Sequence, residues 1–227
     1  MLVRQAPMQR PTVFNGYSQS HMTGLLYHAA LRRLGGVVYD RSHHPEEQFS
    51  TVAQIELFDF DTLILPERTM RGKGVGLADL LGDDPHLLTR CGVRWWIGSS
   101  GTFDVETLTS ARQQGVASVS NLYGASEVGL FAISCPTIPG DYHVAQGHVL
   151  VEVVDRSGVP VENGESGRIV VTHLCGMDEN GQARVHGGTQ ILRLAGGDAA
   201  TFLSDACECG LTAPRLRDIQ RLGRSAT

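Results

Sequence analysis

The chain has 227 residues, of which 41% are hydrophobic and 19% are charged, and its formal net charge is −5. This composition is ordinary for a globular protein that buries a sizeable core, in one large domain or two small ones. The negative charge argues against a nucleic-acid partner, because phosphate binding needs a basic surface. The sequence has no run of about 18 apolar residues that would span a membrane, and residues 1–11 lack the apolar segment of a signal peptide. We therefore expect a cytoplasmic protein with no membrane contact.

The first half of the sequence alternates short apolar runs with segments of helical periodicity. The pattern predicts strands at 12–14, 37–40, 62–65, 93–98 and 116–122, and helices at 22–34, 46–55, 77–81, 85–91 and 105–114. Gly35-Gly36 ends the first helix, and Pro66 closes the third strand. Because alternation of strands and helices is typical of an α/β layer, we predict a partial doubly wound, mainly parallel sheet over residues 1–129.

From about Leu130 the pattern changes to alternating, β-branched segments between glycine-rich turns. Strands are predicted at 148–155, 168–173, 191–194 and 201–203. Asn163-Gly164 and Asn180-Gly181 are typical hairpin turns. Residues 130–227 are therefore predicted to form a small antiparallel β-barrel-like subdomain, with the boundary near residues 128–134.

The cysteines suggest a metal site. Five cysteines are an odd number, and without a signal peptide a disulfide scaffold is not expected. Cys207 and Cys209 offer two thiolates on one tight turn, and Cys135 and His143 lie in a loop rich in proline and glycine. Together they make a Cys₃His set, which suits a structural zinc ion because no position is left for water. The alternative is two reduced surface thiols, one buried cysteine and an unrelated histidine. Cys175 could compete for a ligand position, and Cys91 is expected in the core.

Tyr123-Gly124-Ala125-Ser126-Glu127 directly follows the last predicted parallel strand. Ligands bind at this edge of an open α/β sheet, because the loops at the carboxyl ends of the strands converge there. The carboxylate of Glu127 could hold Mg²⁺ beside a phosphate. The alternative is a turn of small residues that only ends a strand.

The order of motifs along the chain resembles the adenylate-forming (AMP-binding) superfamily, and within it the phenylacetate–CoA ligase-like branch. The resemblance covers residues 12–224 and is carried by these segments: Tyr123–Glu127, Cys135, His143, Gly164-Glu165-Ser166-Gly167-Arg168, Arg193 with Asp198, Cys207-Glu208-Cys209-Gly210 and Gly223-Arg224. These residues correspond to the second half of the family's large domain.

The resemblance implies roles for several of these residues. It places the Tyr123 ring, with Gly124 and Ser126, at the adenine of ATP or AMP, and Glu127 near magnesium and the phosphates as the catalytic acid. Asp198 and Arg224 would contact the ribose, since a carboxylate can accept both hydroxyls of a cis-diol. Surface ion pairing is the alternative for these two residues and for Arg193, which belongs to the same segment as Asp198. The four Cys₃His positions match a structural zinc site in some members of the branch.

Two parts of the family pattern are missing from these residues. No segment before Tyr123 resembles the Ser/Thr/Gly-rich phosphate loop, and the sequence stops near Arg224, before the domain that carries the catalytic lysine. Losing one preorganised donor typically costs about 100- to 1,000-fold in rate, so we expect no independent adenylation.

Three functions stay open. The chain could bind a carboxylic acid or acyl-adenylate and perform a partial reaction such as acyl transfer. It could be one part of a split ligase, or an inactive, zinc-stabilised homologue with a binding or scaffolding role. Apolar surface left by the missing half predicts a homodimer or a complementing protein.

Overall fold

The structure is a computed structural model, and it describes residues 5–41, 51–69, 75–99, 101, 103–147, 149–174, 176–177, 183–184 and 190–223. The chain divides into two compact units, Met1–Leu122 and Tyr123–Thr227. The division lies slightly before the boundary that the change in sequence pattern predicts.

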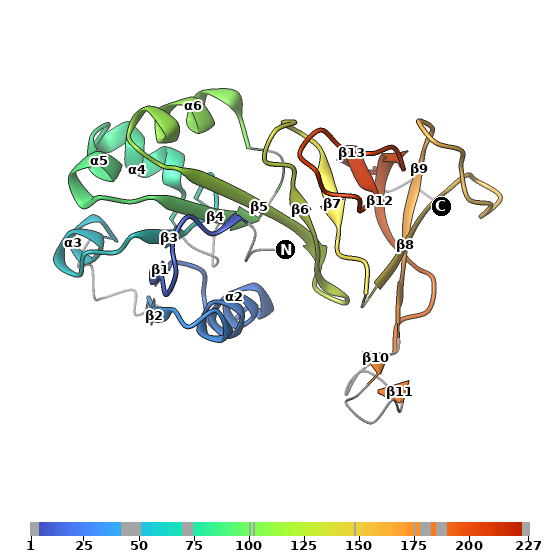
Figure 1. The fold of residues 1–227 in the computed structure, drawn as a ribbon, viewed down its shortest axis with the longest axis horizontal. Helices are drawn as coiled ribbons and strands as arrows, with labels where there is room; N and C mark the ends of the chain where they lie inside the picture. The colour runs from blue at the N-terminus through green and yellow to red at the C-terminus, as the bar shows by residue number, and fades with distance from the viewer. Residues whose placement is uncertain are drawn as a thin grey trace. The chain divides into compact units, whose positions relative to one another are not determined.

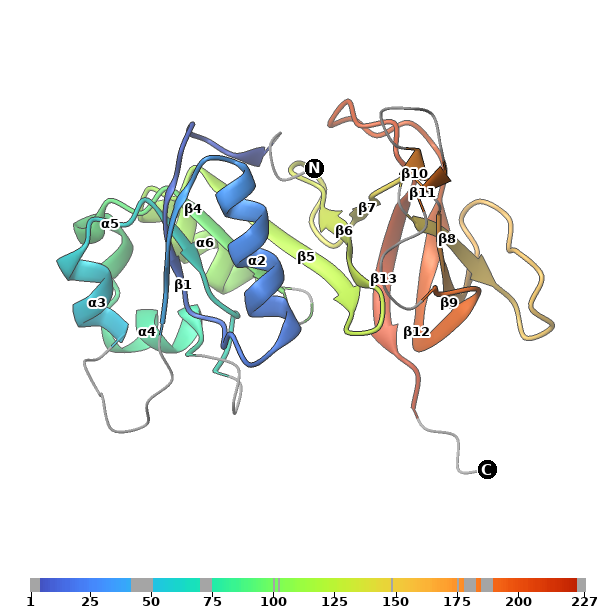
Figure 2. The ribbon, with the colours of Figure 1, turned by 90° about the horizontal axis from the view of Figure 1, so that it is seen from below.

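The first unit is built on parallel strands in the order β2-β1-β3-β4-β5. These strands are β1 (Thr12–Asn15), β2 (Val37–Asp40), β3 (Thr62–Ile64), β4 (Trp95–Ser99) and β5 (Ser118–Ala125), the last of which continues into the second unit. The helices are α2 (Met22–Arg33), α3 (Thr51–Leu57), α4 (Leu77–Asp83), α5 (Leu87–Cys91) and α6 (Val105–Gln113). In Figures 1 and 2, α2 covers one face of these strands and α4, α5 and α6 cover the other. This arrangement confirms the predicted parallel, doubly wound layer.

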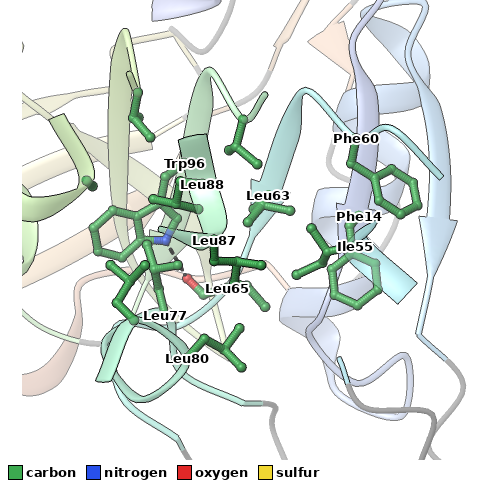
Figure 3. Packing of buried hydrophobic residues seen from close by; sticks show 14 of the residues in the cluster. Phe14, Ile55, Phe60, Leu63, Leu65, Leu77, Leu80, Leu87, Leu88 and Trp96 are labelled. Carbon is green, nitrogen blue, oxygen red and sulfur yellow. Dashed lines mark hydrogen bonds between the residues drawn. The ribbon is translucent and has the colours of Figure 1, made fainter. Parts of the chain in front are cut away.

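The core of the first unit lies between the strands and helices α3 to α6. Figure 3 shows Leu63 and Leu65 packed against leucines of α4 and α5, with the Trp96 ring beside them. Trp96 Nε1 donates to the carbonyl oxygen of Leu65 at 3.0 Å, and the Trp96 ring stacks on Phe103 with centroids 4.2 Å apart. The strands are therefore apolar on this face, as a sheet covered by helices requires.

The second unit is an antiparallel sheet with the strand order β6-β7-β13-β12-β9-β8. Its strands are β6 (Gly129–Ser134), β7 (Tyr142–Val144), β8 (Val149–Val154), β9 (Ser166–His173), β12 (Leu194–Leu203) and β13 (Arg215–Arg221), and a separate short hairpin pairs β10 (Gly176–Met177) with β11 (Ala183–Arg184). A second core of valines and aromatic residues lies on this sheet, with Phe131, Tyr142 and Leu216 among its buried members. The predicted antiparallel character is confirmed.

Two predictions about the second half were wrong. The ranges 191–194 and 201–203 are not separate strands, because one strand, β12, runs from Leu194 to Leu203. The glycine pair inside it forms a bulge, since Gly197 has φ +81° and the register with β9 shifts between Ala195 and Ala199. The strands β6, β7 and β13 were not predicted, because β6 lacks alternation of apolar and polar residues, β7 has only three residues and β13 is rich in arginine.

No helix among the described residues has both the length and the apolar character that crossing a membrane requires.

Candidate functional site

The four predicted metal ligands converge in the second unit. Cys135 follows β6, His143 is the middle residue of β7, and Cys207 and Cys209 lie in the turn between β12 and β13. Their ligand atoms all lie within 4.8 Å of one another. Cys135, Cys207 and His143 are buried, and Cys209 is partly exposed. Residues far apart in the sequence thus form one compact cluster, which we call the Cys₃His cluster.

One of the sulfur distances in this cluster matches a tetrahedral zinc ion. The Sγ atoms of Cys135 and Cys207 are 3.6 Å apart, which is too long for a disulfide. Zinc bonds of about 2.3 Å to sulfur and about 2.0 Å to nitrogen place ligand pairs roughly 3.6 to 3.8 Å apart. Cys209 Sγ lies 3.2 Å from His143 Nε2, which is shorter than this range, so these two side chains would move apart around an ion. Three thiolate sulfurs and one imidazole nitrogen are a donor set that zinc binds. The residues present therefore fit a zinc ion.

The His143 ring is held in the orientation that a ligand needs. Its Nδ1 atom lies 3.0 Å from the carbonyl oxygen of Ala213, which can only accept, so Nδ1 carries the proton. Nε2 is then left with its lone pair directed at Cys209. A hydrogen bond of this kind is typical of histidines that bind metals, because it fixes both the tautomer and the ring angle.

The thiols of the cluster have unequal acidity. Burial raises the pKa of the Cys135 thiol, but hydrogen bonds from the hydroxyl and amide of Thr137 and the amide of Ile138 outweigh it and lower the pKa to about 6. Burial and the nearby thiols of Cys207 and Cys135 raise the pKa of Cys209 to about 11. Several thiolates at this spacing repel one another, and a cation between the sulfurs would remove that repulsion.

A second group of predicted residues also comes together in this unit. The Tyr123 hydroxyl donates to Asp198 Oδ2 at 2.8 Å, although the two residues are 75 positions apart. The other oxygen of Asp198 accepts from Arg221 Nη1 at 3.0 Å, across the β12–β13 pair. Burial, followed by the hydrogen bond to Asp198, raises the pKa of Tyr123, so the hydroxyl stays protonated and donates. The Tyr123 ring packs edge-on against Phe131, with centroids 5.2 Å apart.

The rest of the Tyr123–Glu127 segment forms the end of β5 and a turn. Gly124 lies inside β5, where a Cβ atom would be 2.1 Å from the carbonyl oxygen of Gly129. Glycine is thus required here by the close approach of two backbones. Ser126 and Glu127 are exposed in the turn that leads to β6. The structure therefore gives Gly124 a packing role and leaves Glu127 open to solvent.

Some predicted residues have other surroundings. Arg193 pairs with Glu152 at 2.7 Å on the surface, which agrees with the alternative of surface ion pairing. Arg224 and Cys175 lie outside the described residues.

Arg221 and a buried group of Asp141 with Arg215 and Arg217 were not predicted from the sequence. The alternation Arg215-Leu216-Arg217 is a short signal of a strand, but it breaks at Asp218, which has φ +54° and lies in a bulge of β13.

Similarity to known proteins is visible in the fold and not in the sequence. No protein-family model and no curated protein match this chain. A 2-hydroxyisobutyryl-CoA ligase solved with 2-HIB-AMP and CoA has a TM-score of 0.73 and 17% identity, over 97% of this chain and 45% of that one. The Klebsiella oxytoca NpsA N-terminal subdomain, in complex with 3-hydroxyanthranilyl-AMSN, has a TM-score of 0.62 and 18% identity, over 94% of this chain and 54% of that one. CmiS6 has a TM-score of 0.64 and 16% identity, with coverage of 97% and 55%.

The 227 residues thus span about half the length of these structures. The chain therefore shares its mixed α/β fold with part of each of these structures.

Proposed function

We propose that this chain binds an acyl-adenylate, or the carboxylic acid and nucleotide from which one forms, through residues around Tyr123 and Asp198. The hydrogen bond between Tyr123 and Asp198 carries this proposal, because it joins the two residues that the family resemblance assigns to the adenine and the ribose. The fold adds support, since related folds include proteins solved with acyl-AMP compounds or their analogues.

The chemistry of Asp198 suits a ribose. Each of its oxygens has one partner in the structure, Tyr123 or Arg221. A carboxylate offers about four lone-pair sites, so two remain for the hydroxyls of a cis-diol. The side chain is only 16% exposed, and a hydrogen bond to a charged group in such surroundings contributes about 1.5–3 kcal/mol. We propose that Glu127, exposed in the adjacent turn, holds Mg²⁺ near the phosphate, and that Arg224 adds a ribose contact.

The reaction we propose is at most a partial one. Attack of an amine or thiol on the acyl carbon of an acyl-adenylate forms the new amide or thioester and releases AMP. This step needs no pyrophosphate leaving group, so it does not require the phosphate loop that these residues lack. A split ligase is the related possibility, in which a complementing protein supplies the phosphate loop and the lysine.

We also propose a structural zinc ion at the Cys₃His cluster. Cys135, His143, Cys207 and Cys209 would hold it, and with four protein ligands no position is left for a reacting water. The ion would stabilise the second unit by linking the β12–β13 turn to β7 and to the end of β6.

The alternative is a zinc-stabilised protein without catalysis that binds or scaffolds a partner. In the first unit, Val37 on the outermost strand β2 is 62% exposed, and Leu57 at the end of α3 is 68% exposed. Such exposed apolar residues favour a homodimer or a complex with a complementing protein. Light scattering tests the homodimer, because it measures the molar mass of the protein in solution. A monomer would count against the partner proposal.

Calorimetric titration with a non-hydrolysable acyl-adenosine sulfamate separates the two functions. Saturable heat at one site supports acyl-adenylate binding, whereas no heat with acyl-adenylate analogues or ATP supports the scaffold. Release of pyrophosphate only after a complementing protein is added would identify a split ligase.

A further inference from the structure

A buried carboxylate with two arginines lies beside the Cys₃His cluster. Asp141 is fully buried, and its oxygens lie 2.7 Å from Arg215 Nη1 and 2.6 Å from Arg217 Nε. A third contact of 3.0 Å joins Arg217 Nη2 to Asp141 Oδ2. Arg217 therefore binds the carboxylate through two guanidinium nitrogens, Nε and Nη2. The side chain of Arg215 is 7% exposed and that of Arg217 is 42% exposed. We call these three residues the Asp141 cluster.

The Asp141 cluster is tied to two of the four metal ligands. The carbonyl oxygen of Asp141 accepts from the Cys135 amide at 2.7 Å. Arg215 lies directly opposite His143 in the β7–β13 ladder, and opposite residues place their side chains on the same face of a sheet. Ala213, two positions before Arg215, accepts from the His143 ring. The contact between Asp141 and Arg215 therefore helps to fix where Cys135 and His143 lie.

The charges of the two clusters are opposite. Two arginines and one carboxylate sum to 2 − 1 = +1, and Arg215 Nε is buried without a partner among the described residues. A zinc ion with three thiolates and one neutral histidine carries 2 − 3 = −1. A buried charge is costly unless an opposite charge lies nearby, so a positive Asp141 cluster would stabilise an anionic zinc centre beside it.

We propose that the Asp141 cluster positions the Cys₃His centre and compensates its charge, so that metal retention depends on the positive charge of Arg215. This inference rests on the proposed zinc site, but it assigns a role to residues that are not ligands. Outer-shell partners of metal ligands typically contribute about 10- to 100-fold to metal affinity. The Arg215→Met variant keeps most of the side-chain volume and removes the charge.

The test measures zinc affinity by competition with a chromophoric chelator, using the full chain. Arg215→Met is expected to lose about 10- to 100-fold in affinity, and Arg215→Lys to lose much less. Arg193→Met is the matched control, because it removes an exposed arginine of the same unit that pairs with Glu152, and its affinity should equal that of the original chain. The cobalt-substituted forms should all keep thiolate-to-metal charge-transfer absorption, since the ligands are unchanged.

Thermal unfolding separates charge compensation from a merely structural role. Arg215→Met should lower the melting temperature more in the zinc-loaded protein than in the metal-free protein, because weaker zinc binding reduces the stability that the bound metal adds. Equal shifts in both forms would overturn the inference. If Arg215→Met does not fold, Arg217→Met replaces it in the measurement of zinc affinity. Arg217→Met should bind zinc roughly 2- to 5-fold more weakly, because solvent screens the half-exposed charge of Arg217.

The outcomes distinguish the two proposals. If the original chain binds one zinc and Arg215→Met or Arg217→Met binds it equally well, the inference is wrong and the zinc site stands. If the original chain binds no zinc or cobalt, both are wrong.

Discussion

The sulfur atoms of Cys135 and Cys207 lie 3.6 Å apart although 72 residues separate them in the chain. His143 and Cys209 complete the group within 4.8 Å. Two strands and a turn must fold correctly to bring these four side chains together in the second unit. We therefore propose that a metal ion bound by them would stabilise this unit.

The first prediction concerns metal content. Elemental analysis of the untreated protein should find about one zinc per chain, and Cys207→Ser should find little. Loss of the metal should destabilise the protein by at least about 2 kcal/mol, which corresponds to roughly 4–8 °C in melting temperature for a chain of this size. Cys91→Ser, a change in α5 of the first unit, is the matched control and should keep its zinc. Less than half an equivalent in the original protein would contradict the zinc site.

The second prediction concerns Gly124. Gly124→Ala should destabilise the second unit by about 2–3 kcal/mol or more, because its Cβ would lie 2.1 Å from the Gly129 carbonyl oxygen and the backbone must move. Gly82→Ala is the control, since a Cβ there meets nothing within 4 Å and alanine favours the helix α4. Circular dichroism during heating measures both. Equal stability of the two variants would show that the β5–β6 turn tolerates the side chain.

The third prediction concerns the start of α6. Asp104 accepts from the Thr107 amide at 2.7 Å, and this hydrogen bond is the main cause that lowers the pKa of Asp104 below 3.8. Asp104→Ala should cost about 1 kcal/mol, and Asp104→Asn should cost less because asparagine also caps helices. A lowered carboxyl pKa stabilises the fold above pH 4, and this contribution is lost as the pH falls through the folded-state pKa.

Urea unfolding followed by tryptophan fluorescence measures this effect in the first unit alone, because the chain has two tryptophans and both, Trp95 and Trp96, lie in β4. The difference between the original protein and Asp104→Ala should be largest at pH 7 and smaller at pH 3. A difference that does not change with pH would mean that the charge of Asp104 is unimportant.

The strands and helices of the first unit could be predicted because local pattern and tertiary structure agree there. Buried parallel strands are continuous apolar runs, as at Trp95–Ser99, and the helix α2 ends where the sequence places Gly35. The grouping of Cys135, His143, Cys207 and Cys209 could also be predicted from their residue types and the tight turn at Cys207–Cys209, and their role as metal ligands stays a prediction.

The second unit was harder to predict because its strands depend on partners that are distant in sequence. Strand β13 carries three arginines, and its place in the sheet follows from Leu216 in the core and from Asp141, which binds Arg215 and Arg217. The bulge at Gly197 makes one strand resemble two short ones in the sequence. The short alternation Arg215-Leu216-Arg217 is a local sign of β13, but the local sequence does not show which strands β13 pairs with or where β12 bulges.

The fourth prediction tests the central claim, which is binding of an acyl-adenylate at Tyr123 and Asp198. Calorimetric titration with an acyl-adenosine sulfamate should give one saturable site for the original chain. Asp198→Asn should weaken binding by roughly 10- to 150-fold, because it removes a charged acceptor worth about 1.5–3 kcal/mol. Arg193→Met, which removes a surface pair with Glu152 and a hydrogen bond to the Gly158 carbonyl oxygen, should bind normally. Absence of binding by the original chain, or equal binding by Asp198→Asn, would contradict the account.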